Sequence, residues 1–261
     1  MCKYFDLDTD NAIVANGENF PDALSGSALA AKLNAPIILT DGQNIADQKD
    51  YLDSRHYKNI TLLGGSGSID ILTEYALKGS DNVTDEEKDY INKLSYYCNA
   101  YADISLNYVQ DMNKFDPIAK SLNQNSSNNI TALTDFLNKY IDLMNDMKSL
   151  NNTYKQKFLD LKDQVSSLQS PGSTELLKTD YINGIDTVLK KLDILIGYMD
   201  NFINLCTEIK DAVNSNNINK AMELTQELKT LKYNLDKERT PYVNDITKLR
   251  SKLLKIQSYI Q

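Results

Sequence analysis

Two kinds of hydrophobic spacing divide this chain. In the first 80 residues, short and largely apolar runs alternate with polar turns: Ala12–Ala15, Ile37–Thr40 and Ile60–Leu63. Continuous runs of about this length are typical of buried strands. From Thr84 onward, apolar residues instead recur every three or four positions, which is typical of helices that bury one face. The pattern therefore predicts an α/β part followed by an all-α part.

Helical segments are expected between and after the three predicted strands. Ala23–Leu33 is rich in alanine, leucine and small residues, Asn44–Ser54 is a weakly periodic surface helix, and Ile69–Leu77 follows the third strand. Pro21 fits the first turn of the first helix, where a missing N–H costs nothing. The β-α-β-α-β-α order predicts a small parallel three-stranded sheet covered by helices.

The second part of the chain shows a regular helical register. A capping box, Thr84 with Glu87, begins it. Between Leu133 and Leu168 apolar residues alternate steps of four and three, and only Asn151 breaks the alternation. The segment Asn123–Asn129 is predicted to be a loop.

Two further helices are predicted in the same register, Ile185–Val213 and Ile218–Ile260, and Pro241 is expected to kink or split the second one. Short connections between such long helices favour an elongated antiparallel bundle, a rod or stalk. We predict a domain boundary near residue 80, with the α/β part over residues 1–80 and the helical bundle over residues 81–261.

Charge excludes several classes of partner. The formal net charge is −8, which disfavours nucleic acid and anionic membrane surfaces as partners. Residues 1–80 hold 6 Lys/Arg and 11 Asp/Glu, a balance of 6 − 11 = −5, so the α/β part is the more acidic one. Because no run of about 18 apolar residues occurs, no membrane span is predicted.

Reactive residues are scarce. Cys2, Cys98 and Cys206 are too few and too scattered for a disulfide framework or a metal site. Cys98 and Cys206 fall on apolar helical positions, so we interpret them as buried thiols; a bridge between them requires that their helices be neighbours. His56 lies in a polar connection and is predicted to be exposed. No catalytic residue, metal ligand or cofactor is predicted.

Two patterns have both a structural and a functional interpretation. Gly64–Ser68 follows a strand and precedes a helix, so its backbone amides could cradle a phosphate, but it lacks the Lys-Ser/Thr of a P-loop. We interpret it as a strand-to-helix turn. The sixteen tyrosines could stack on carbohydrate, yet many of them, including Tyr101, Tyr140 and Tyr154, occupy core positions, and we assign those to the core.

Candidate binding residues follow the first strand. Asn19, Asp22 and Ser25 are expected at its carboxyl end, where open α/β sheets bind ligands. Their side chains could hydrogen-bond sugar hydroxyls. Helix capping and local turn bonds explain them about as well, so both interpretations stay open.

A family resemblance rests on the same region. The phrase NGENFPDALSGSALAAKLNAPIILTD, followed by ITLLGGSGSI at Ile60–Ile69, resembles the cell wall binding repeat type 2 of clostridial and related Gram-positive surface proteins. The resemblance covers about residues 4–79, the carboxyl-terminal part of one repeat, whereas such repeats usually occur three in tandem. By resemblance, the Pro-Ile-Leu-Leu signature of the family, which has been linked to recognition of a wall polymer, corresponds to Pro36, Ile37, Ile38 and Leu39.

The resemblance implies a partner. Such repeats attach proteins non-covalently to an anionic polysaccharide of the Gram-positive wall. Because a polyanion is bound by cations and this segment is acidic, we expect this chain alone to bind purified polymer weakly or not at all, and upstream repeats to restore binding.

The leading hypothesis is a non-enzymatic, S-layer-associated surface protein that is secreted, with its export signal upstream, and that displays a helical stalk. In the alternative, the helical region is a protein-interaction or self-association module and the α/β part is a structural cap. A wall-active enzyme is a third hypothesis that no motif here supports.

Overall fold

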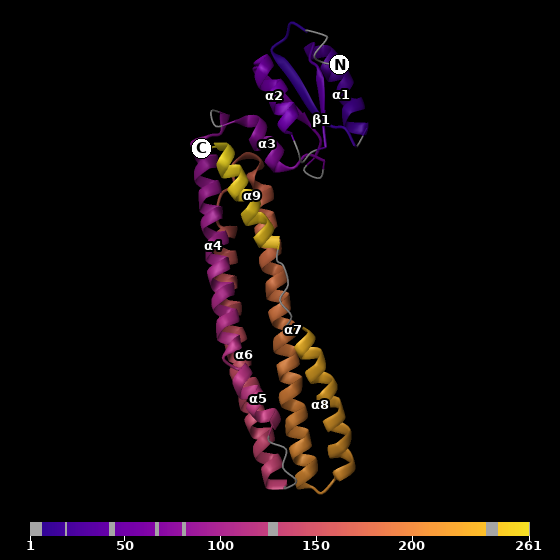
Figure 1. Ribbon diagram of the computed structural model, residues 1–261, viewed down its shortest axis with the longest axis vertical. Helices are drawn as coiled ribbons and strands as arrows, with labels where there is room; N and C mark the ends of the chain where they lie inside the picture. The colour runs from indigo at the N-terminus through magenta and orange to yellow at the C-terminus, as the bar shows by residue number, and fades with distance from the viewer. Residues whose placement is uncertain are drawn as a thin grey trace. The chain divides into compact units, whose positions relative to one another are not determined.

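The computed structural model describes residues 7–18, 20–41, 45–65, 68–79, 82–124, 130–238 and 245–260. Three strands and nine α-helices occur in this part of the chain, and one 3₁₀ turn spans Gly172–Thr174 (Figure 1). The elements are, in order, β1 (Asn11–Asn16), α1 (Phe20–Leu33), β2 (Ile37–Thr40), α2 (Ala46–Arg55), β3 (Asn59–Leu63), α3 (Ile71–Lys78), α4 (Asp85–Asn113), α5 (Asp116–Gln124), α6 (Ile130–Ser166), α7 (Glu175–Asn214), α8 (Ile218–Glu238) and α9 (Asp245–Ile260).

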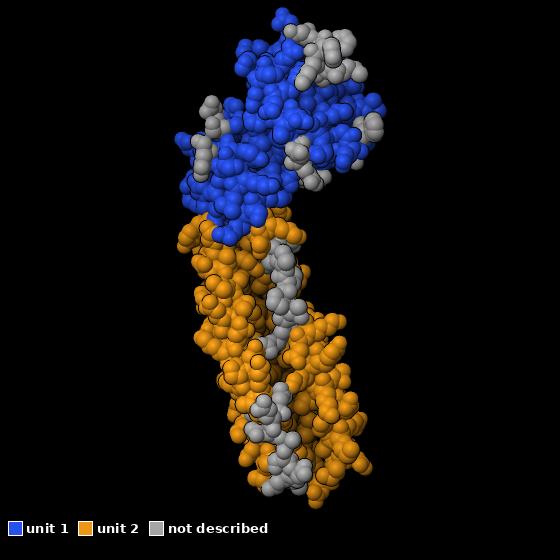
Figure 2. Space-filling model, viewed as in Figure 1, with its two compact units in different colours: residues 1–95, 170–177, 250–261 blue, residues 96–169, 178–249 orange. Residues whose placement is uncertain are grey.

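The chain divides into two compact units (Figure 2). Unit 1 comprises residues 1–95, 170–177 and 250–261, and unit 2 comprises residues 96–169 and 178–249. Unit 1 thus combines the α/β region with stretches that lie far away in the sequence. The domain boundary near residue 80 stays a prediction.

The sheet of unit 1 has the predicted parallel arrangement. The strand order is β2-β1-β3, and both neighbours pair with β1 in parallel, with Ile13 opposite Ile37 and Val14 opposite Leu62. Successive residues of the central strand point to opposite faces. Val14 accordingly packs in a cluster with Leu52 of α2, whereas Ile13 packs with Ala30 of α1. Helices therefore cover both faces, as continuous apolar strands require.

One glycine of α1 lies close to β3. A Cβ atom at Gly26 would lie 2.2 Å from Leu63 Cδ1, so a larger residue would require the end of the Leu63 side chain to move. The small residues that the sequence places in this helix thus allow it to lie close to β3.

Unit 2 is a set of long helices whose predicted seam is buried. The register found in the sequence of α6 faces the core: Leu137, Tyr140, Met144, Met147, Tyr154, Phe158, Leu161 and Val165 are all buried. Along α7, Leu195, Met199, Phe202, Cys206 and Ile209 belong to the same hydrophobic cluster as the first half of the α6 set.

Polar pairs fix the alignment of α6 with α7. Lys148 pairs with Asp200, Lys155 with Asp193 and Lys162 with Asp186, each with 2.5 Å between nitrogen and oxygen. One residue number rises by seven as the other falls by seven, so the two helices are antiparallel. We call these three pairs the lysine–aspartate ladder. The antiparallel helical bundle predicted from the sequence is confirmed here.

Asn151, the polar break in the seam, is fully buried in unit 2. Its amide nitrogen donates to the carbonyl of Met147 at 2.7 Å, and its oxygen accepts from the Tyr108 hydroxyl at 2.9 Å. Because these bonds satisfy the amide, a polar residue is tolerated inside an apolar seam.

Other local predictions have mixed outcomes. The helical segment that starts with the capping box is interrupted, because α4 ends at Asn113 and α5 begins at Asp116, with Pro117 in its first turn. The predicted loop Asn123–Asn129 is wrong at its start, since α5 continues to Gln124; residues 125–129 lie outside the described residues. Pro241 also lies outside them, between the separate helices α8 and α9.

Candidate ligand-binding site

The carboxyl edge of the sheet is organised by Asn16, the last residue of β1. Its side chain is buried, and its amide nitrogen donates to the carbonyl of Ser68 while its oxygen accepts from the backbone N–H of Glu18 at 2.8 Å. The N–H of Gly17 also donates to the carbonyl of Thr40, at 2.8 Å. Asn16 therefore joins the segments that follow β1 and β3, which is a structural role.

The residues predicted after β1 are placed differently from one another. The Ser25 hydroxyl is exposed and donates to the backbone carbonyl of Asp22 at 3.1 Å, a local bond within α1. Asp22 is half-buried, and its carboxylate oxygen lies 3.2 Å from the position that a Cβ of Gly64 would occupy. Asn19 lies outside the described residues. Their binding roles stay a prediction.

Most of the signature residues Pro36–Leu39 are shielded from solvent, and their binding role stays a prediction. Ile38 is buried with Ala12 and Val14, and the carbonyl of Pro36 accepts from the N–H of Ile13 at 2.9 Å. Ile37 is half-buried. Only Leu39 is strongly exposed, at 52%. The structure therefore brings one of the four side chains to a surface that a ligand can reach.

Leu39 lines an open cavity of about 400 Å³ at this edge of the sheet, together with Gly17 and Thr40. The remaining polar lining includes the carboxylates of Glu18, Asp41 and Asp47. Asp22 and Ser25 are not among its lining residues. Three carboxylates make this cavity acidic, so it repels rather than attracts an anionic polymer.

The glycine-rich turn bonds to itself. The N–H groups of Ser68 and Ile69 both donate to the carbonyl of Gly65, at 2.8 and 3.0 Å. Because these two amides already have an acceptor within the turn, the described part of the segment fits the predicted strand-to-helix turn. Ser66 and Gly67 lie outside the described residues.

A larger cavity of unit 1, about 790 Å³, is lined by α2, α3 and α9. We call it the α2–α3–α9 cleft. Its polar lining residues are Lys49, Asp53, His56, Tyr57, Lys78, Asn82, Ser258 and Tyr259. Its apolar lining comes from the half-buried Ile60 and Leu77 and from the almost completely buried Leu52 and Ala76.

The wall of the cleft from α2 is shaped by the end of that helix. His56 is its C-cap, with φ of 53°, and its N–H donates to the carbonyl of Leu52 at 3.1 Å. The left-handed conformation turns the chain so that Tyr57 enters the cleft. The Tyr57 hydroxyl lies 3.4 Å from that of Tyr51. His56 itself is exposed, as the sequence predicted.

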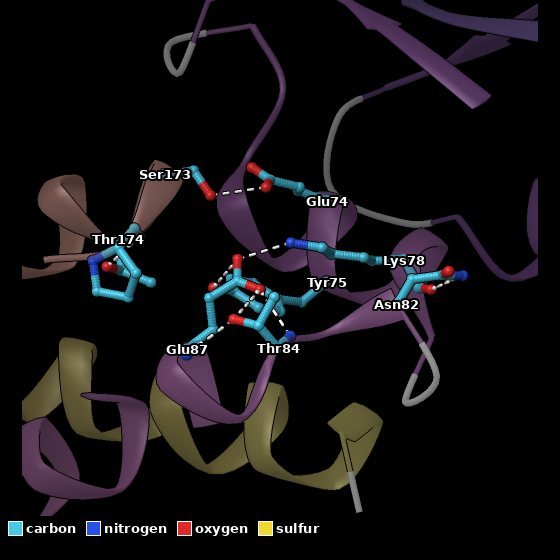
Figure 3. A network of polar contacts seen from close by, with 9 residues as sticks. Glu74, Tyr75, Lys78, Asn82, Thr84, Glu87, Ser173 and Thr174 are labelled. Carbon is cyan, nitrogen blue, oxygen red and sulfur yellow. Dashed lines mark hydrogen bonds and ion pairs between the residues drawn. The ribbon is translucent and has the colours of Figure 1, made fainter. Parts of the chain in front are cut away.

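The wall from α3 rests on a polar network drawn in Figure 3. Lys78 binds the carboxylate of Glu87 at 2.6 Å, and Asn82 donates to the backbone carbonyl of Lys78 at 2.9 Å (Figure 3). The same carboxylate accepts from the N–H and the hydroxyl of Thr84, at 2.9 and 3.2 Å, so the predicted capping box is confirmed.

Electrostatics hold Glu87 in its ionised form. Burial of its carboxylate acts to raise its pKa, but the hydrogen bonds from Lys78 and Thr84 and the charge of Lys78 outweigh burial, so the pKa is lowered. Burial and the neighbouring Glu87 carboxylate raise the pKa of Tyr75, whose hydroxyl lies 3.5 Å from Glu87. A rigid, ionised anchor therefore supports the α3 side of the cleft.

The wall from α9 joins residues far apart in sequence. Lys252 binds Asp70 at 3.0 Å, and the Gln257 amide donates to Asn92 at 2.9 Å, both within unit 1. Tyr259 is 39% exposed. Sequence reasoning missed Tyr57, Asn82 and Tyr259, because no spacing within one segment indicates that α9 meets α2 and α3.

The described residues were searched for a metal-binding group and for a membrane-spanning helix. Among them, no group of three or more His, Cys, Asp or Glu could hold a metal ion. No described helix is long and apolar enough to cross a bilayer. Cys98 and Cys206 are both buried, and neither is part of a disulfide.

Comparison with known proteins finds similarity in the α/β region. Residues 2–72 match the family model for cell wall binding domain 2 (CWB2), which confirms the resemblance over this segment. Over 79 residues the chain is 30% identical to the N-acetylmuramoyl-L-alanine amidase LytC of Bacillus subtilis (strain 168). That stretch is 30% of this chain and only 16% of the amidase. No solved structure matches the chain.

Proposed function

We propose that this protein associates non-covalently with an anionic polysaccharide of the Gram-positive cell wall through its α/β region, and that its long helices form a non-enzymatic segment displayed at the cell surface. The match of residues 2–72 to a cell wall binding domain carries the proposal. The intact parallel sheet supports it, because the matched segment is folded and covered on both faces.

Binding by a single chain should be weak. The cavity at the sheet edge is acidic, and Lys49, Lys58 and Lys78 of unit 1 already hold carboxylates. Weak sites become effective when several act together, since the second contact forms at a high effective concentration. Several copies on one surface, or further repeats in the native protein, would supply that gain.

The test compares one copy with many. The full chain is used in two forms, free in solution and coupled densely to beads. Each form is mixed with soluble wall polysaccharide from a Gram-positive organism. We expect weak binding in solution and clear capture of polymer by the beads; walls stripped of the secondary polymer serve as the control. Beads that capture no polymer would show the proposal to be wrong.

The non-enzymatic part of the proposal needs its own measurement. The amidase that this chain resembles is matched over 16% of its length, so its activity is a property of that protein alone. We expect incubation of the chain with purified wall to release neither free amino groups nor reducing ends above the rate of a buffer control. Release that scales with protein concentration would overturn this part.

A second candidate function belongs to unit 2, which carries a cavity of about 530 Å³. Its lining combines the apolar side chains of Val109, Met112 and Leu195 with the carboxylates of Asp236 and Glu238. Such a surface favours a protein partner or self-association of the helical region. Sedimentation velocity over a range of concentrations tests self-association, because a constant monomer mass would exclude it.

A further inference from the structure

We propose that the α2–α3–α9 cleft is the saccharide-binding site of unit 1, and that it recognises the uncharged sugar rings of a wall polysaccharide rather than its anionic groups. The inference rests on the proposed function and deepens it by naming the site and the part of the polymer it contacts. Three observations carry it: the size and lining of the cleft, its tyrosines, and the pairing of its cations.

The cleft has the dimensions and the lining of a small-ligand site. Its volume of about 790 Å³ lies within the range of about 300–1,000 Å³ that is usual for such sites. The half-buried Ile60 and Leu77 supply apolar surface, while Asp53, Asn82 and Ser258 supply hydrogen-bonding groups. A sugar ring presents one apolar face and a rim of hydroxyls, which this combination matches.

Open space lies at the end of α3. Gly79 caps this helix with φ of +64°, and a Cβ atom placed on it would meet nothing within 4 Å. The space beside Gly79 is therefore open. A ligand can approach the backbone there.

Two tyrosines that lie far apart in the sequence provide aromatic surface in the cleft. Tyr57 follows α2 and is half-buried, and Tyr259 near the end of α9 is 39% exposed. The ring of a partly exposed tyrosine can pack against the apolar face of a ligand while its hydroxyl keeps a hydrogen bond. Tyrosines of this kind differ from Tyr101, Tyr140 and Tyr154, which are buried in unit 2.

The charges of the cleft favour sugar hydroxyls over phosphate or carboxylate groups. Lys49 binds Asp53 at 2.9 Å and Lys78 binds Glu87 at 2.6 Å, so both lysines of the lining hold a carboxylate. An anionic group would have to compete with these carboxylates and meet Asp53 as well. A hydroxyl can instead accept from a lysine and donate to Asp53 at the same time.

The matched family segment alone cannot form this site. It ends at residue 72, whereas Lys78, Asn82, Ser258 and Tyr259 line the cleft. The helical part of the chain therefore completes the site, with α9 held to the α/β region by the Lys252–Asp70 ion pair.

The experiment measures binding of wall-polysaccharide fragments of two to four sugars to the full chain by nuclear magnetic resonance, which detects millimolar affinity. We expect the backbone signals of Tyr57, Asn82 and Tyr259 to shift. Tyr259→Ala should weaken binding about tenfold, because it removes the aromatic surface, whereas Tyr259→Phe should retain it. Tyr233→Ala is the matched control, since Tyr233 is a 70% exposed helical tyrosine of unit 2.

Salt separates the two modes of recognition. We expect the affinity to change less than about twofold between 50 and 500 mM NaCl, since no net charge is neutralised on binding. A steep loss of affinity with salt, or equal losses in Tyr259→Ala and Tyr259→Phe, would overturn the proposal.

Failure of this proposal can be told apart from failure of the proposed function. If the chain binds wall polymer and Tyr259→Ala binds equally well, the cleft is not the site and the proposed function stands. If neither fragments nor bead-coupled chains bind polymer, the proposed function is wrong and the saccharide site with it.

Discussion

A single carboxylate, Glu87, joins three structural roles in unit 1. It closes the capping box at the start of α4, binds Lys78 at the end of α3, and lies beside the buried Tyr75. Its side chain is 6% exposed, so it is ionised in a place where an unpaired charge would be costly. The end of α3 at Lys78 and the start of α4 at Thr84 are thereby joined through one carboxylate.

Replacing Glu87 by Gln should lower the free energy of unfolding by about 1–2 kcal/mol, because a capping bond and an ion pair are both weakened. Because the folded state lowers the pKa of Glu87, its contribution is present above the ordinary carboxyl pKa and is lost as pH falls through the lowered value. Urea denaturation between pH 3 and 7 measures both effects.

The control for this substitution is Glu86→Gln, an exposed carboxylate in the same turn of α4. It should leave the stability almost unchanged. If Glu87→Gln and Glu86→Gln unfold at the same urea concentration at every pH, the anchoring role of Glu87 is contradicted.

At the scale of elements, the lysine–aspartate ladder sets the register of α6 against α7. Its members are partly exposed: the side chains of Lys155 and Asp193 are 32% and 56% exposed. Ion pairs of this kind add little stability, but like charges brought together by a slip of register would be repulsive. The ladder therefore specifies alignment more than it stabilises the bundle.

A double-mutant cycle on Lys155→Asp and Asp193→Lys tests this role. Each single reversal should destabilise unit 2 by more than its matched control, Asp160→Asn, because it places like charges side by side. The double reversal should restore most of the stability, with a coupling of about 0.2–1 kcal/mol that disappears in 1 M NaCl. Additive effects of the two reversals would mean that the pair carries no register information.

Element prediction from the sequence succeeded where the pattern is local. The apolar runs around Ile13, Ile38 and Leu62 became parallel strands, and the seam of α6 is buried with its polar break at Asn151. The candidate site was harder to predict from the sequence. Ser25 bonds locally and Ile38 is core, because the carboxyl end of a strand indicates where ligands bind in general and not which side chains are free.

The placement of α9 could not be predicted at all. Leu253, Ile256 and Ile260 repeat every three or four residues, a spacing that suits any helical seam. They are buried, and the part of the helix from residue 250 belongs to unit 1. Packing of this helix in unit 1 rather than in unit 2 is indicated only by long-range pairs such as Lys252–Asp70. Such pairs leave no periodic pattern in a sequence.

At the scale of the whole molecule, the thiols report on the integrity of unit 2. Cys98 and Cys206 are 1% and 0% exposed, and burial raises the pKa of Cys206 to about 12. In a Cys2→Ser background at pH 8, we expect a disulfide reagent to modify neither thiol until denaturant unfolds unit 2. Without denaturant, the rate of reaction should be lower than that of a free thiol by the fraction of unfolded molecules, about 10⁻³ to 10⁻⁶. Stoichiometric labelling without denaturant would contradict this packing.

The make-up of unit 1 from three separated stretches has a consequence for the order of assembly. Residues 250–260 complete this unit, and every residue of unit 2 is synthesised before them. During translation the α2–α3–α9 cleft therefore lacks one wall until the helices of unit 2 and then α9 have emerged. Contacts that span so much of the chain form slowly. A nascent chain stalled before α9 should consequently contain the formed antiparallel pair of α6 and α7 but an incomplete α2–α3–α9 cleft.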